Sequence, residues 1–143
     1  MSANSESTSV ADAQPLLRWM RCLLRFVAVY NVLAGVTMLV FYHEMYKLVD
    51  VAKPQLVLPI QLVGVLVGLF GVGYWLVARR PVENRDLLLL GFLSKGLGSV
   101  LGVYYVFRGV LPPVFLVVLF FADIVYLVPF WVIIRRLYRL AGK

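Results

Sequence analysis

The sequence predicts an all-α membrane protein, a bundle of four transmembrane helices with both termini in the cytoplasm. Its 143 residues are 62% hydrophobic with a mean hydropathy of +0.90, well above the composition of a soluble domain. The apolar residues gather into four runs, each long enough to cross a bilayer as a helix. These runs span about residues 26–42, 55–78, 87–107 and 114–134.

The distribution of basic residues predicts the orientation. A net charge of +7 is compatible with nucleic-acid binding, but the Lys and Arg residues flank the apolar runs, which is typical of membrane topology. Ten of them lie in the N-terminal flank, the loop between the second and third runs, and the C-terminal tail, whereas three lie in the other two loops. The positive-inside rule then places both termini in the cytoplasm. We expect a lipid bilayer, and no nucleic acid, as the surroundings of this chain.

The N-terminal segment divides into two parts. Residues 1–14 are rich in Ser and contain no Lys or Arg, which predicts a disordered tail rather than a signal peptide. Residues 15–143 then form the transmembrane domain. Arg18, Arg21 and Arg25 alternate with apolar residues and predict an amphipathic turn in the headgroup region, either an orientation signal or an anionic-lipid site.

The first two runs carry features of helix packing. Asn31 is expected to hydrogen-bond to a neighbouring helix. Gly64 and Gly68 form a small-xxx-small pair, which favours close helix contact within the chain or between chains. Tyr74 and Trp75 lie at the end of the second run, where aromatic rings favour the membrane interface.

The loop between these runs, residues 43–54, has mixed charge and holds the single histidine, His43. No second His and no Cys lies near it in the sequence, so a metal site would lack ligands. We expect a solvated loop at the interface, and we expect no metal or other cofactor.

The third run contains the most informative pattern. Gly91, Lys95, Gly98 and Gly102 are spaced i, i+4, i+7 and i+11, so they share one helical face. Small residues let a neighbouring helix come close, and a lysine within a membrane needs a partner. Asp123 is the only acid inside another apolar run.

Lys95 and Asp123 are predicted to pair. A short turn joins the third and fourth runs, which favours antiparallel neighbours, and the two residues lie about 12 and about 16 Å from the cytoplasmic ends of their helices. The pair is either a permanent buried clamp or one wall of a polar pocket for an ion, a proton or a headgroup. Four polar residues are candidates to assist in either role, Asn31, Gln61, Ser94 and Ser99.

Three segments resemble a known family. LGFLSKGLG (90–98), GVLPPVF (109–115) and ADIVYLVPF (122–130) resemble a family of uncharacterised bacterial four-helix integral membrane proteins, and the architecture is loosely similar to DoxX-type proteins. The resemblance implies the fold and a bacterial inner membrane, and it carries no activity. The positions that match are Lys95, Gly98, Pro112, Asp123, Pro129 and Phe130. Ala122 stands where the family has Asn, and Val125–Tyr126 where it has two Trp.

Three classes of function follow. The first is a binding or interaction bundle that self-associates or joins a larger membrane complex, as the glycine faces favour. The second is a small transporter, channel or proton-linked carrier that uses Lys95 and Asp123. The third, an integral membrane enzyme, is disfavoured because the sequence holds one His, one Cys and no metal or phosphate motif. We identify no catalytic residue.

Overall fold

The computed structural model describes residues 14–142, so the predicted tail of residues 1–14 lies outside the described residues except for Gln14. About 80% of the structure is helical, and residues 14–142 contain no strand. Four helical segments are long and apolar enough to cross a membrane. The all-α class and the four long helices are therefore confirmed.

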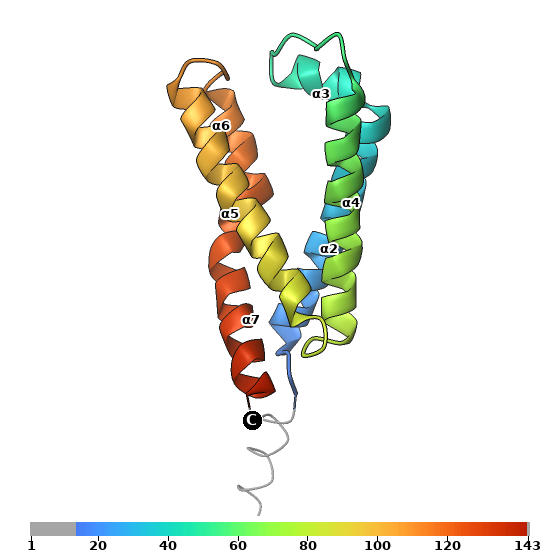
Figure 1. Cartoon of the computed structure of the whole chain (residues 1–143), viewed down its shortest axis with the longest axis vertical. Helices are drawn as coiled ribbons and strands as arrows, with labels where there is room; N and C mark the ends of the chain where they lie inside the picture. Colours follow the sequence, from blue (N-terminus) through green and yellow to red (C-terminus); the bar gives the residue numbers. More distant parts are fainter. Residues whose placement is uncertain (1–13, 143) are drawn as a thin grey trace, which may run out of the picture.

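The four long segments form two antiparallel pairs. In Figure 1 the pairs approach each other at the end where α2 begins and the chain terminates, and they diverge toward the end that carries α3 and α6. The first pair consists of α2 (Arg18–Val40) and α4 (Leu58–Arg79), with the short helix α3 (Tyr42–Leu48) between them. The second pair consists of α5 (Arg85–Phe107) and a last segment built from α6 (Val114–Leu119), the π-helix η1 (Phe120–Ile124) and α7 (Val125–Ala141).

Glycines bring α2 and α4 into backbone contact. A Cβ atom added to Gly35 would lie 2.5 Å from the Gly64 carbonyl oxygen, and one added to Gly71 would lie 2.7 Å from the Ala28 carbonyl oxygen. Such distances leave no room for a side chain, so these positions allow the two helix axes to come close. The backbone of Gly68 also lies against Gly35.

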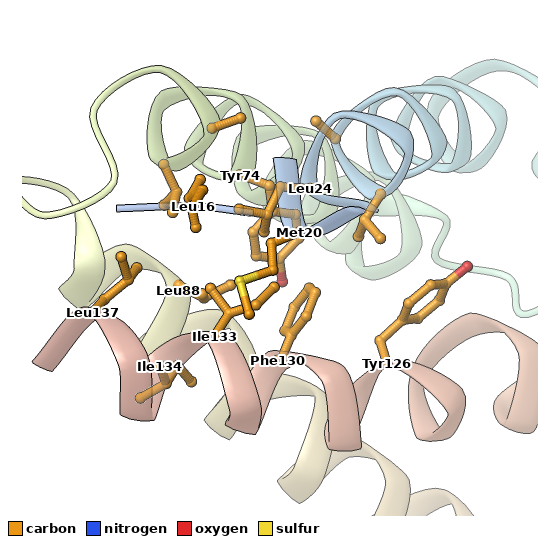
Figure 2. Close-up of a cluster of buried hydrophobic side chains, with 14 residues drawn as sticks. Leu16, Met20, Leu24, Tyr74, Leu88, Tyr126, Phe130, Ile133, Ile134 and Leu137 are labelled. Carbon is orange, nitrogen blue, oxygen red and sulfur yellow. The ribbon is translucent and has the colours of Figure 1, made fainter. Parts of the chain in front are cut away.

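A hydrophobic core joins the two pairs at the end near the termini. Figure 2 shows Met20 and Leu24 of the first pair facing Phe130 and Ile133 of α7. The rings of Tyr74 and Phe130 meet edge to face with their centroids 5.2 Å apart, and both residues are almost fully buried. This aromatic contact connects α4 to α7 directly.

The position of Tyr74 corrects the sequence-based expectation. We expected both Tyr74 and Trp75 at the membrane interface, but Tyr74 is only 1% exposed because α7 packs against this face of α4. Trp75 points away from the core and is 42% exposed. The Arg25 guanidinium lies 5.8 Å from its ring, at a distance typical of a cation–π contact.

The prediction of a loop over residues 43–54 is also partly wrong, because the helix α3 occupies the first half of this segment. The sequence from Tyr42 to Leu48 contains no Gly or Pro. Glu44 and Lys47 form an ion pair one turn apart, 3.4 Å between Oε1 and Nζ, with the acid at the N-terminal side as a helix favours.

Candidate functional site

Lys95 and Asp123 are in direct contact. The Lys95 Nζ lies 2.7 Å from Asp123 Oδ1, and it also donates a hydrogen bond to the Ala122 carbonyl oxygen at 2.9 Å. Both acceptors lie in η1, where Val125 N–H bonds to the Phe120 carbonyl five residues back. A π-helical turn interrupts the regular i→i−4 pattern, which makes a main-chain carbonyl accessible to the lysine.

An aromatic ring lies beside the lysine headgroup. The Lys95 Nζ lies 5.5 Å from the centre of the Tyr126 ring, within the range of a cation–π interaction. That ring lies 6.3 Å from Tyr30 and 6.2 Å from Phe130, between centroids. The ammonium group is therefore held by a carboxylate, a carbonyl and an aromatic face.

The ion pair forms part of the wall of a cavity of about 380 Å³. Residues of both helix pairs line the cavity, from Tyr74 beside the core to Met45 of α3. Its volume is within the range of small-molecule sites. Its lining combines polar groups (Asn31, Thr37, Ser94, Lys95 and Asp123), aromatic rings (Tyr30, Phe70 and Tyr74) and small or flexible apolar residues (Ala34, Met38, Met45, Val67, Gly98, Val118 and Ala122).

The two charged residues differ in how far they are exposed. The Lys95 side chain is 7% exposed, whereas the Asp123 side chain is 28% exposed. Asp123 Oδ1 accepts from Lys95, and within residues 14–142 no donor reaches Oδ2. That oxygen is also not among the enclosed polar atoms without a partner. A residue of the cavity wall therefore carries an accessible carboxylate oxygen.

The neighbouring polar residues add mainly acceptors. The expected hydrogen bond from Asn31 to a neighbouring helix is wrong, because its amide Nδ2 donates to the Val27 carbonyl of its own helix at 2.8 Å. Its Oδ1 therefore remains available to accept. Thr37 donates its hydroxyl to the Leu33 carbonyl at 2.9 Å, which leaves the lone pairs of its oxygen. The polar groups of α2 and the Asp123 carboxylate therefore all offer hydrogen-bond acceptors.

Four of the six candidate polar residues line this cavity, namely Asn31, Ser94, Lys95 and Asp123. Gln61 does not, because it lies near the start of α4 and donates to the Leu39 carbonyl of α2 at 3.3 Å. Ser99 does not either, since its hydroxyl donates to the Lys95 carbonyl one turn back at 2.6 Å. Both residues support the helices rather than face the cavity.

Most of the predicted packing glycines make contacts within the chain. A Cβ atom added to Gly64 would meet Gly35 and Met38, one at Gly91 would meet the Tyr74 ring, and one at Gly102 would meet Phe115 and Leu119. A Cβ atom at Gly68 would meet no atom within 4 Å. The prediction that Gly98 packs against a neighbouring helix is wrong, because a Cβ atom there would meet no atom of the described residues within 4 Å. The helix pairs have diverged there, and Gly98 lines the cavity instead.

Several lining residues did not emerge from the sequence. Tyr30 and Thr37 are seven residues apart, and Phe70 and Tyr74 are four apart, so each pair shares a helical face. This periodicity was a usable signal for two common faces. Nothing in it indicated that both faces lie across from Lys95, since that depends on how the two helix pairs pack.

No protein-family model, curated protein or solved structure matches this chain. The resemblance to bacterial four-helix membrane proteins therefore stays a prediction. Among residues 14–142, no group of three His, Cys, Asp or Glu side chains is placed to hold a metal ion.

Proposed function

We propose that the four long helices span a membrane and that the protein binds a polar or charged ligand in the cavity beside Lys95 and Asp123. The site would serve a small carrier or a membrane-embedded binding protein. Both termini would lie in the cytoplasm, as the asymmetry of basic residues favours, and the membrane would be a bacterial inner membrane. The cavity would then open toward the opposite side, because its lining reaches α3 and α6.

One observation carries this proposal: the ion pair borders a cavity instead of being enclosed by side chains. A clamp that only stabilises the bundle is best served by complete burial with all its hydrogen bonds made. Here Asp123 retains an oxygen to which no residue from 14 to 142 donates, and its side chain is partly exposed beside a volume of about 380 Å³. Charged groups at such depth commonly mark a ligand or ion pathway.

Self-association and membership of a larger membrane complex stay predictions. They rested on glycine faces, and Gly64, Gly91 and Gly102 are occupied by neighbours within the chain. The oligomer size in mild detergent tests them. A single-chain particle without a copurifying protein would count against both.

Thiol labelling tests the binding cavity. In a Cys22→Ser background, Gly98→Cys places a thiol in the cavity, where a Cβ atom meets no atom within 4 Å. Val100→Cys is the matched control, because it lies on the same helix at similar depth and is 70% exposed on another face. We expect a charged, membrane-impermeant thiol reagent added outside intact cells to label Gly98→Cys and to spare Val100→Cys. Equal labelling of the two variants would contradict a water-accessible cavity.

Reporter fusions test the orientation. A C-terminal fusion after Lys143 is expected to fluoresce with a protein that matures only in the cytoplasm. The same fusion to alkaline phosphatase, which is active only outside the cytoplasm, is expected to be inactive. The reverse result would place the cavity mouth on the cytoplasmic side.

A further inference from the structure

We propose that the ligand is an organic cation, an amine or a quaternary ammonium compound, which replaces the Lys95 ammonium at Asp123 and causes Lys95 to release a proton. This inference rests on the proposed binding cavity and names its ligand class. It is carried by the exposed carboxylate, the surrounding acceptors and the aromatic lining.

The accessible polar atoms of the cavity favour a donor or a positive charge. Asp123 presents an oxygen without a donor, and Asn31 and Thr37 have used hydrogens on main-chain carbonyls of their own helix. Within the described part of the chain, Lys95 is the only cation in the lining, and it is 7% exposed with two of its three hydrogens already donated. The other donors of the lining are neutral, the hydroxyls of Ser94, Tyr30 and Tyr74 and the second amide hydrogen of Asn31, and an anion that used them would lie beside the Asp123 carboxylate, a like charge.

The apolar part of the lining suits an organic cation better than a metal ion. Tyr30, Phe70 and Tyr74 supply aromatic rings, and Met38 and Met45 supply polarisable thioethers. Aromatic faces attract ammonium groups that have little hydration, whereas a hard metal ion requires several oxygen ligands. The Lys95 ammonium, 5.5 Å from the Tyr126 ring, already shows that this environment holds a cation.

Charge balance couples binding to a proton. Among residues 14–142, the only charged residues in the lining are Lys95 and Asp123, and the other titratable side chains around them are the phenols of Tyr30, Tyr74 and Tyr126. A cation at Asp123 would leave the Lys95 ammonium beside a like charge in apolar surroundings, which disfavours its charged form. One cation enters, the carboxylate exchanges its partner, and one proton leaves Lys95 for water. The neutral amine keeps a hydrogen for the Ala122 carbonyl.

Binding of benzyltrimethylammonium to the full-length protein in nanodiscs tests this exchange. In the wild type, the apparent affinity is expected to rise about tenfold for each unit of pH, because one proton is released per cation bound. A pH indicator in weak buffer is expected to report one proton per cation. Affinity that does not change with pH, or binding without proton release, would overturn the exchange.

Two substitutions separate the roles of the pair. Lys95→Met removes the ammonium group that competes with the ligand for Asp123. This variant is expected to bind benzyltrimethylammonium with an affinity that no longer changes with pH. Asp123→Asn is expected to bind no more than empty nanodiscs. If either variant fails to fold, the proton count on the wild type still decides between exchange and no exchange.

Two other probes distinguish failure of this inference from failure of the proposed function. In the first probe, neopentylbenzene (the neutral isostere) or benzenesulfonate protects Gly98→Cys from the thiol reagent, and benzyltrimethylammonium does not. This result would overturn the proposal that the ligand is a cation, while the cavity would remain a binding site. Absence of labelling at Gly98→Cys without any ligand, with the reagent present on both sides of the membrane, would refute the proposed function itself.

Discussion

Replacing Gly91 by alanine is expected to loosen the contact between the two helix pairs. A Cβ atom at this position would collide with the Tyr74 hydroxyl and would lie 2.5 Å from Cε1 of the same ring. The ring has little room to move, because Tyr74 is 1% exposed and packs edge to face on Phe130. Overpacking of this kind costs about 1–3 kcal/mol. The gain in helix propensity from Gly to Ala offsets about 1 kcal/mol of it.

Gly98→Ala is the matched control, since it lies two turns further along the same face of α5 and its Cβ atom would meet no atom within 4 Å. It keeps the propensity gain without the collision. The free energy of unfolding is measured by titrating SDS into protein held in mild detergent. It is therefore expected to be about 1–3 kcal/mol lower for Gly91→Ala than for Gly98→Ala. Equal stability of the two variants would refute the packing of Tyr74 between α5 and α7.

Two further predictions concern the other contacts that hold the helices. Lys95→Met and Asp123→Asn are expected to be less harmful together than the sum of their separate effects, with a coupling of about 1–2 kcal/mol in the same titration; a coupling near zero would contradict the 2.7 Å contact. Gly35→Ala is expected to destabilise α2 against α4 by about 1–3 kcal/mol, because its Cβ would lie 2.5 Å from the Gly64 carbonyl oxygen. Gly73→Ala, whose Cβ would lie 3.9 Å from Leu87 Cδ1, is its control and is expected to be neutral or stabilising.

Features that depend on local sequence were predictable. The four long helices follow from apolar runs of sufficient length. The first begins at Arg18 instead of residue 26 and the last continues to Ala141 instead of residue 134, because each extends through a basic amphipathic flank. The approach of Lys95 to Asp123 follows from two isolated charges at similar depth on adjacent helices, where each needs the other. The close approach at Gly64 follows from the absence of a side chain.

Features that depend on packing between distant segments were not predictable. The cavity exists because the two helix pairs join at one end and diverge at the other (Figure 1). Tyr74 belongs to the core only because α7 covers it. Its position near the end of an apolar run therefore led to the wrong prediction of a place at the membrane interface. The π-helical turn at η1 has no sequence signal that we recognised, and it supplies the Ala122 carbonyl to the site.

The most direct test of the central claim is a structure determined in lipid nanodiscs, with attention to the space between Lys95, Asp123 and Tyr30. The account predicts the lysine and aspartate in contact at the wall of a cavity that contains water or a bound polar molecule. A cavity closed by side chains, with both carboxylate oxygens enclosed and bonded, would contradict it and would leave the ion pair as a structural clamp.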